Sequence, residues 1–211
     1  MPLMVHRSLM RDVQMGIWEI AETEPELRAK LQLNAAELSH LESIKVERKR
    51  LQWLASRCVV RFLLCTPEFI SMNVTPSGQP LITSMQRNVS ITHSGRFAGA
   101  MVSSEQAVGL DLEEVSDKVM AIRHKFINEQ EEKFLDANDA MSTLVAWSAK
   151  EALFKWYGKG EVDFRKHMTL HPFQLQPRGV IKAVFAKPDL NRLLNVEYEV
   201  SGELAVTWVY G

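Results

Sequence analysis

Segments typical of strands and helices occur along this chain in two successive rounds, and this order limits the folds open to it. The first round has a probable strand at 13–20, a strong helix at about 47–64, and the strand-like runs NVSIT and FAGAMVSS. The second opens with AVGLDLE, continues with a long helix around 147–157, and ends with the strand-like runs VIKAVF, NVEYEV and LAVTWVY. Strands and helices grouped in this way favour an α+β fold with two halves of similar size, 1–105 and 106–211.

Composition and charge exclude several classes of protein. The hydrophobic share is 46% and the charged share 24%, ordinary values for a globular chain. The net charge of -1 gives no global basic field, and one short basic helix, ERKRLQWLASR, is poor support for nucleic-acid binding. No apolar run approaches membrane-spanning length, and the first residues lack the apolar core of a signal peptide. Cys58 and Cys65 lie too far apart on a helix for a disulfide, so we expect two buried thiols in a reducing cytoplasm.

The helix predicted at 47–64 has an apolar stripe and, on another face, a row of arginines. Its apolar residues recur at helical spacing and predict a core stripe: Leu51, Leu54, Ala55, Cys58, Val59 and Phe62. Arg50, Arg57 and Arg61 follow one another at i, i+7 and i+11, which aligns their guanidinium groups. This alignment places the three side chains on one side of the helix, on a different face from the apolar stripe.

The run VGLDLEEV, residues 108–115, places two carboxylates at i and i+2. On a strand, Asp111 and Glu113 share one face, opposite the apolar residues of the run. Like charges this close repel each other, and a divalent cation such as Mg²⁺ relieves the repulsion. The alternative is an edge strand with a polar outer face, because a D-x-E pattern is too short to be specific.

The run WSAKEALFKWYGKG, residues 147–160, sets Glu151 next to Lys150 and one turn before Lys155. On a helical wheel, Glu151 and Lys155 share a stripe away from a buried stripe made of Val145, Ala149, Ala152 and Trp156. Read alone, Glu151 and Lys155 form a solvated ion pair of about 0.3–0.5 kcal/mol. Read with Asp111 and Glu113, Glu151 completes a three-carboxylate magnesium site, and both lysines neutralise phosphate.

Capping signals mark the ends of the second round's helices. Asn128 with Glu131 has the spacing of a capping box and predicts a helix start. Asp139 is placed to cap the long helix, and Gly158 with Gly160 suits its carboxyl end.

The run ITHSGRFAG, residues 91–99, reads as a strand that ends in a small polar loop. Glycine lets the backbone approach a ligand closely, and His93 beside exposed backbone donors could hold a phosphate. The alternative is a hairpin turn with a surface histidine.

Taken together, these motifs resemble those of the 4′-phosphopantetheinyl transferases. VGLDLEEV looks like the family's G-(I/V/L)-D-x-E motif, and WSAKEALFKWYGKG looks like its W-(S/T)-x-K-E-A-x-x-K-x-x-G-x-G motif. ITHSGRFAG is similar to the S-H-S-x-x-(Y/W/F) segment, and LQWLASRCVVR to the arginine-bearing helix. The likeness covers roughly residues 45–160. The length resembles that of the larger, monomeric Sfp-type members, built as two pseudo-symmetric α+β halves with the active site in the cleft between them.

The resemblance implies a reaction and a set of residues. The 4′-phosphopantetheine arm of coenzyme A would pass to a serine of an apo acyl or peptidyl carrier protein, with Mg²⁺ or Mn²⁺, and adenosine 3′,5′-bisphosphate would leave. The carrier would serve fatty-acid, polyketide or nonribosomal-peptide biosynthesis in the cytoplasm. Asp111, Glu113 and Glu151 would hold the metal, with Glu151 and Lys155 catalytic. The metal would thus lie in the half 106–211, and coenzyme A would contact mostly the half 1–105. The implied coenzyme A contacts are Arg50, Arg57, Thr92, His93, Lys150 and Lys155.

The sequence departs from the family pattern at two positions and offers one candidate surface for binding the carrier protein. Gln79 stands where the family often has the lysine of G-K-P, which removes one phosphate-binding charge, and Thr92 stands where serine is usual. The segment 118–134 offers candidate contacts for an acidic carrier: Met120, Arg123, Lys125 and Phe126. The alternative is that Phe126, with Ile122, belongs to the core.

Two other functions compete with the transferase. A magnesium-dependent phosphohydrolase would use the same carboxylates, with water in place of the serine. A non-catalytic module that binds coenzyme A or a carrier would be expected to have a broken acidic set. Here the three carboxylates and the nearby lysine are all present, which disfavours such a module. They are Asp111, Glu113, Glu151 and Lys155.

Overall fold

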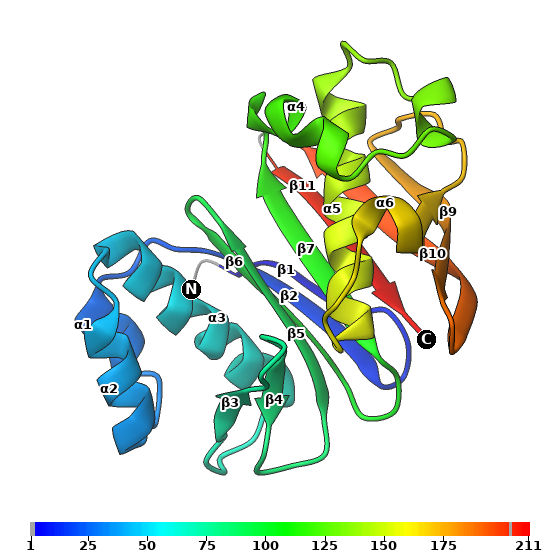
Figure 1. Cartoon of the computed structure of the whole chain (residues 1–211). Coiled ribbons are helices and arrows are strands. Elements are labelled where there is room, and N and C mark those ends of the chain that lie inside the picture. The colour runs from blue at the N-terminus through cyan, green and yellow to red at the C-terminus, as the bar shows by residue number, and fades with distance from the viewer. Residues whose placement is uncertain (1–2, 203) are drawn as a thin grey trace. The chain divides into compact units, whose positions relative to one another are not determined.

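The computed structural model describes residues 3–202 and 204–211, which form two compact units, Met1–Val108 and Gly109–Gly211. Each unit combines a sheet with helices, which confirms the predicted α+β class (Figure 1). The boundary between the units lies close to the one predicted at 105/106. Within the part of the chain that the structure describes, no helix is both long enough and apolar enough to cross a membrane.

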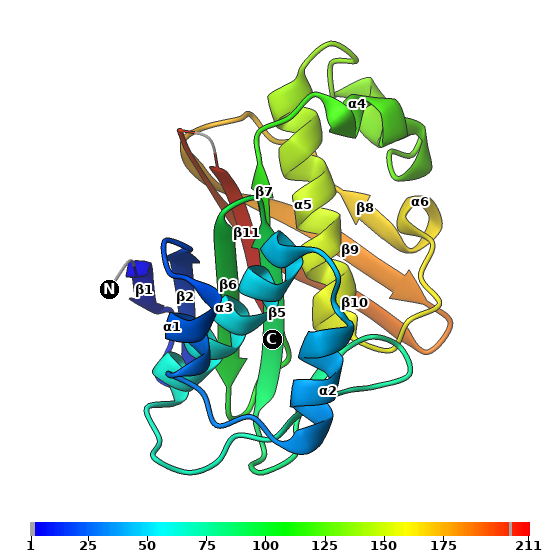
Figure 2. The same cartoon turned by 90° about the vertical axis from the view of Figure 1, so that its left-hand side faces the viewer.

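Unit 1 is built on a four-stranded antiparallel sheet, in the order β1-β2-β6-β5, with a long helix packed against it (Figure 2). The strands are β1 (Leu3–Ser8), β2 (Val13–Glu19), β5 (Asn88–Ser94) and β6 (Phe97–Ser103). The helix is α3 (Glu47–Leu64), as predicted. Its Val59, Val60 and Leu63 join Trp18 and Val102 of the sheet in one buried core. Burial of this apolar stripe holds the helix on the sheet.

Four short elements complete unit 1: α1 (Glu24–Arg28), α2 (Ala35–Ser43), β3 (Met72–Val74) and β4 (Pro80–Ile82). The two strands form a small hairpin, and Gln79 lies in its turn, where Thr75 N donates to the Gln79 carbonyl at 2.8 Å. The two thiols differ, although both were expected to be buried. Cys58 is buried, but Cys65 is exposed because it caps α3 in the left-handed conformation, with φ 46°.

Unit 2 contains a five-stranded sheet in the order β7-β11-β10-β9-β8, with one long helix across it (Figure 1). The strands are β7 (Val108–Glu114), β8 (Met168–Leu170), β9 (Arg178–Lys187), β10 (Leu190–Ser201) and β11 (Leu204–Tyr210). The helices are α4 (Lys118–Ile122), η1 (Arg123–Lys125), η2 (Glu131–Lys133), α5 (Ala140–Tyr157) and α6 (Phe164–His167). Strands β8 to β11 pair in antiparallel fashion, in chain order.

Helix α5 begins and ends where the sequence predicted. The Asp139 carboxylate accepts a hydrogen bond from Ser142 N at 3.0 Å, and Gly158 closes the helix in the left-handed conformation at φ 67°. The capping box of Asn128 and Glu131 also forms, but it starts only the three-residue η2 rather than a longer helix. The Glu131 carboxylate has other partners in the core, which are described below.

Candidate functional site

A glycine determines how closely α5 lies against β7. A Cβ atom on Gly109 would stand 1.9 Å from the carbonyl oxygen of Ala152 and 2.8 Å from the amide nitrogen of Trp156. Only glycine therefore permits this approach of strand to helix. Side chains at i, i+2 and i+4 of a strand share one face, so Asp111 and Glu113 follow Gly109 on the side covered by α5. The sequence reading missed this role of Gly109, although a glycine inside a strand is a known sign of close backbone approach.

Asp111 is held by α5 through both oxygens of its carboxylate. Ser148 Oγ donates to Oδ2 at 2.8 Å, and Lys155 Nζ donates to Oδ1 at 2.7 Å. Ser148 Oγ also lies 2.9 Å from Thr207 Oγ1 of β11, which fixes the serine. Asp111 itself is only 4% exposed. Strand β7 is an edge strand, as the alternative reading proposed, but the face that carries Asp111 is covered by the helix rather than open to solvent.

Glu113 is held by an aromatic side chain of the same helix. The indole Nε1 of Trp147 donates to Glu113 Oε1 at 3.2 Å. The Trp147 ring contacts the rings of Phe126 and Phe164, with centroid separations of 5.0 and 5.6 Å. Trp147 was noted in the sequence only as part of a motif, and the structure shows what it binds.

The charge of Glu151 is destabilised by its surroundings. Burial, together with the negative charges of Asp111 and Glu113, raises its pKa to about 7, while Lys155 acts in the opposite direction. The three predicted metal ligands therefore influence one another in one neighbourhood of unit 2. Lys155 pairs with Asp111 on the facing strand, which replaces the solvated ion pair with Glu151 expected from helical spacing alone.

This donor set suits a hard divalent cation. Carboxylate oxygens are what Mg²⁺ and Mn²⁺ prefer, and mutual repulsion that raises a carboxylate pKa is relieved by a cation. As the side chains stand, with Lys155 on Asp111, no three His, Cys, Asp or Glu residues within 3–202 and 204–211 are arranged as a metal site. A cation would take over the neutralising role that Lys155 has in this structure.

Lys150 does not occupy the position expected for a phosphate-binding residue. Its side chain is 0% exposed, and its ammonium is surrounded by protein acceptors, among them Glu131 Oε2 at 2.7 Å. The sequence contained a signal for this, because Lys150 shares a helical stripe with Ala146 and Leu153, and both of these are fully buried. The expected phosphate contact of Lys150 is therefore corrected to a buried ion pair.

The arginines of α3 have partners within unit 1. Arg50 Nε donates to Glu24 Oε2 at 2.7 Å, so a local carboxylate neutralises it. The Arg57 guanidinium lies 3.4 Å from the centroid of the Trp53 ring, and burial lowers its pKa to about 10. Arg61 donates to the backbone carbonyl of Glu68, not to a carboxylate. Of the three, only Arg50 has a carboxylate within hydrogen-bond distance among the described residues.

Thr92 and His93 lie at the end of β5, where it turns into β6. Residues 92–94 pair with 97–99, so the segment is a hairpin, with Gly95 at φ 51° in the turn. Thr92 is buried at 4% exposure, whereas His93 is exposed. The side-chain amide of Gln52 in α3 donates to the Gly95 carbonyl at 2.7 Å and fixes the turn. These residues belong to unit 1 and the acidic set belongs to unit 2.

The candidate carrier contacts divide into two kinds. Phe126 is 0% exposed, so the core alternative holds for it. Arg123 donates to Glu132 Oε1 and to the Leu135 carbonyl, and its side chain is only 13% exposed. Lys125 is exposed and Met120 is half-buried, and they remain available as surface contacts.

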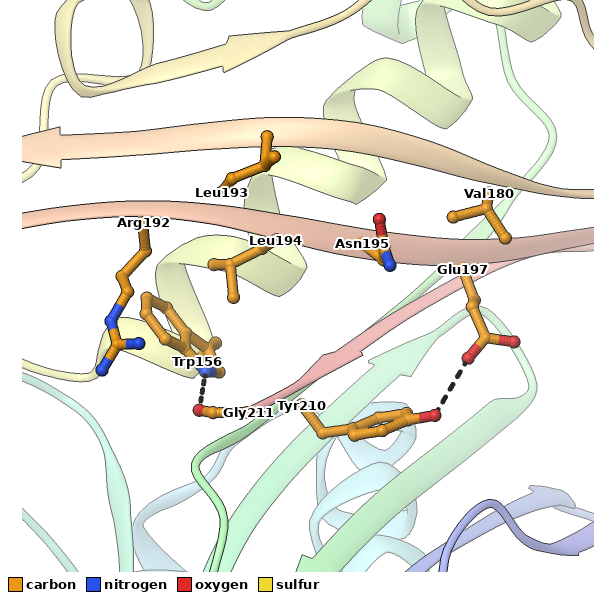
Figure 3. Close-up of a pocket in the computed structure, with 9 residues that line it drawn as sticks. All are labelled: Trp156, Val180, Arg192, Leu193, Leu194, Asn195, Glu197, Tyr210 and Gly211. Carbon is orange, nitrogen blue, oxygen red and sulfur yellow. Dashed lines mark hydrogen bonds between the residues drawn. The ribbon is translucent and has the colours of Figure 1, made fainter.

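A pocket of about 400 Å³ lies elsewhere on unit 2, between the end of α5 and strands β9 to β11 (Figure 3). Trp156 Nε1 donates to the Gly211 carbonyl at 2.9 Å, and Tyr210 Oη donates to Glu197 Oε1 at 3.3 Å. The remaining lining residues are Val180, Arg192, Leu193, Leu194 and Asn195. Because this lining includes none of the three carboxylates, we place the candidate site at β7 and α5, not here.

Comparison with protein families gives one match, which includes the acidic site. Residues 107–209 match the family model described as the 4′-phosphopantetheinyl transferase superfamily, so this part of the chain is similar to that superfamily. The matched range contains the whole acidic set and both long sequence motifs. Comparison with curated proteins found no match.

Proposed function

We propose that this protein transfers the 4′-phosphopantetheine arm of coenzyme A to a serine of an apo carrier protein, as a member of the two-halved Sfp type. The observation that carries the proposal is the acidic set of β7 and α5, which lies inside the matched domain. The serine oxygen would bond to the phosphorus next to the pantetheine arm. The phosphoanhydride bond would break, and adenosine 3′,5′-bisphosphate would leave with the electron pair.

Asp111, Glu113 and Glu151 are the residues that would hold Mg²⁺ or Mn²⁺. Bound there, the cation would neutralise the pyrophosphate charge as the bond breaks. Ser148 and Trp147 of α5 donate hydrogen bonds to Asp111 and Glu113, respectively, and fix the orientation of these carboxylates. Held carboxylates need little rearrangement when a ligand arrives.

Glu151 and Lys155 are the proposed catalytic pair. Without a cation, burial and the neighbouring carboxylates raise the pKa of Glu151 to about 7. A bound cation would lower that pKa, so Glu151 would be ionised near neutral pH and able to accept the serine proton. Lys155, half-buried beside Asp111, would stabilise phosphate oxygens once a cation takes its place on that carboxylate. In unit 1, Arg57 and His93 are the proposed phosphate contacts, because Arg57 has a buried Nε without a hydrogen-bond partner among the described residues and His93 is exposed. Arg50 and Thr92 are weaker candidates, since one is paired and the other buried.

Intact-mass spectrometry tests the proposal. An apo acyl carrier protein incubated with the protein, coenzyme A and Mg²⁺ should gain the mass of one phosphopantetheine, and a chelator should abolish the gain. Glu151→Gln should lower the transfer rate at least about 100-fold, the usual contribution of a positioned base. Asp189→Asn removes one negative charge from an exposed turn of unit 2 and should leave the rate unchanged.

Two outcomes would overturn the proposal. One is an unchanged rate in Glu151→Gln. The other is release of adenosine 3′,5′-bisphosphate from coenzyme A without any carrier, with no mass gain on acyl or peptidyl carriers. That second result would indicate a phosphohydrolase, which uses the same carboxylates with water as the acceptor.

A further inference from the structure

A fully buried ion pair lies one residue away from Glu151 on α5. Lys150 and Glu131 are both 0% exposed, with 2.7 Å between Nζ and Oε2. Lys150 Nζ also lies within hydrogen-bond distance of the carbonyls of Phe126 (2.6 Å), Phe164 (3.1 Å) and Met168 (3.1 Å). The ion pair therefore ties α5 to two other segments of the chain, residues 126–131 and 164–168.

The carboxylate of Glu131 extends this network. Its Oε1 accepts a hydrogen bond from Leu170 N of β8 at 2.8 Å, and its Oε2 accepts one from Asn128 N at 2.9 Å. A buried ion pair contributes little net stability, because desolvation of the two charges offsets their attraction. What it adds here is a set of directed bonds that fix the backbone around residues 126–131 and 164–170.

Two of the carbonyls bound by Lys150 belong to the residues whose rings hold Trp147. The Phe126 and Phe164 rings contact the indole at centroid separations of 5.0 and 5.6 Å. The indole N–H in turn donates to Glu113 Oε1 at 3.2 Å. A continuous chain of contacts thus runs from the Lys150–Glu131 pair, through two phenylalanines and Trp147, to a carboxylate of the acidic site.

We propose that Lys150 and Glu131 are positioning residues, which hold Phe126 and Phe164 against Trp147 so that its indole keeps Glu113 in place for a divalent cation. The inference rests on the proposed function, because it takes the acidic set as a metal site. Residues that orient a metal ligand typically change metal affinity 10- to 100-fold when they are removed. Lys150 then serves the site from the core and does not touch the phosphate.

Direct binding of Mn²⁺, followed by electron paramagnetic resonance without coenzyme A or carrier, tests this chain of contacts. The double variant Lys150→Met/Glu131→Leu replaces the ion pair with apolar side chains and leaves no buried charge unpaired. Trp147→Phe keeps an aromatic ring but removes the N–H donor. Each should weaken Mn²⁺ binding about tenfold or more. All three changes combined should weaken it no further than the larger single effect, since both act through Glu113.

A matched control separates positioning from general loss of stability. Tyr198 of unit 2 is buried, and its hydroxyl bonds the backbone at Gln174 and Gln176. Tyr198→Phe should lower the melting temperature without changing Mn²⁺ affinity. If the double variant does not fold, Phe164→Leu loosens the aromatic clamp with the ion pair intact, and it should still weaken Mn²⁺ binding.

Wild-type affinity in the double variant or in Phe164→Leu would overturn the inference, as would losses that multiply when Trp147→Phe is added. A failure of this inference can be distinguished from a failure of the proposed function. A wild-type protein that binds Mn²⁺ with these dependences but modifies no carrier would keep the positioning role and lose the transferase. A wild-type protein that binds no Mn²⁺ would contradict both.

Discussion

Each unit of this protein packs an 18-residue helix against a sheet, yet the two helices place their charges in opposite ways. On helix α3, Arg50 pairs with Glu24 at about one-quarter exposure for each side chain. Helix α5 brings Lys150 to 0% exposure and binds Asp111 with Ser148 and Lys155. A charge that several elements hold inside the protein is fixed in position, and chemistry that depends on position can use it.

The largest expected difference between the units is the cost of deleting one helix cation. Lys150→Ala leaves the Glu131 carboxylate buried without its partner, which should cost about 3–5 kcal/mol in the free energy of unfolding. Arg50→Ala removes a partly exposed pair and should cost about 0–1 kcal/mol. Urea denaturation of both variants measures the contrast. Equal losses would show that burial of the cation is not what distinguishes α5 from α3.

The second contrast concerns the glycines that let each sheet meet its helix. On Gly109 an added Cβ would stand 1.9 Å from backbone oxygen, so Gly109→Ala should cost about 3 kcal/mol, because the helix must move. On Gly16 it would meet side-chain atoms of Val59 and Leu63 at 3.0 and 3.3 Å. These can shift, and Gly16→Ala should cost about 1 kcal/mol or less. Thermal unfolding of the two variants tests this, and a larger loss for Gly16→Ala would reverse the comparison.

A third difference appears in the pH dependence of stability. The pKa of Glu151 is raised to about 7 in the folded protein, above its value of about 4.3 in an unfolded chain. Between these values the folded state binds the extra proton, so this group's contribution to stability falls as pH rises and is constant above about pH 7. Without metal, Glu151→Gln should therefore be more stable than wild type by about 3 kcal/mol at pH 8 and equal to it near pH 4.

Denaturation with chelator present, at both pH values, measures this effect. Asp189→Asn, which removes an exposed charge, serves as the control and should track wild type at each pH. A Glu151→Gln protein that is less stable than wild type at pH 8 would mean that the Glu151 charge is stabilised in the fold. Burial, with repulsion from Asp111 and Glu113, would then not be what dominates the energy of this charge.

The sequence predicted the elements well because their signals are local. Periodicity set the bounds of the helix at 47–64, and Asp139 and Gly158 marked the ends of the second long helix by cap chemistry alone. It also selected Asp111, Glu113, Glu151 and Lys155, because the two motifs that contain them resemble a known family's. It failed for Lys150, because a charged residue in a charged motif was interpreted as exposed although its helical neighbours are apolar.

Contacts between distant segments could not be predicted. Glu131 was read only as half of a capping box, and nothing near it in sequence indicates that Lys150 completes its bonding. The same holds for Trp147 and Glu113, which are joined by folding alone. Cys65 was misassigned for a different reason, since it was read as part of the helix although the helix predicted at 47–64 ends just before it, and Cys65 is the exposed left-handed cap.

The smallest expected effect uses the two thiols as a probe of unit 1. Cys65 is exposed, whereas burial raises the pKa of Cys58 to about 12. At pH 8 only about 10⁻⁴ of such a thiol is ionised, so iodoacetamide should label Cys65 quickly and Cys58 only when unit 1 opens. Mass spectrometry after timed labelling counts the modified thiols.

Gly109→Ala turns this labelling into a test of how the two units depend on each other. Its damage falls in unit 2, while both cysteines lie in unit 1. If each unit's core holds it together independently, labelling of Cys58 should stay as slow as in wild type even where unit 2 is destabilised. If the two units unfold as one, Cys58 should react faster in Gly109→Ala than in wild type. Gly16→Ala should then speed the reaction less, in proportion to its smaller loss of unfolding free energy. The contrast between α3 and α5 would then be a difference in charge placement within a single cooperative structure, not between two separately stable ones.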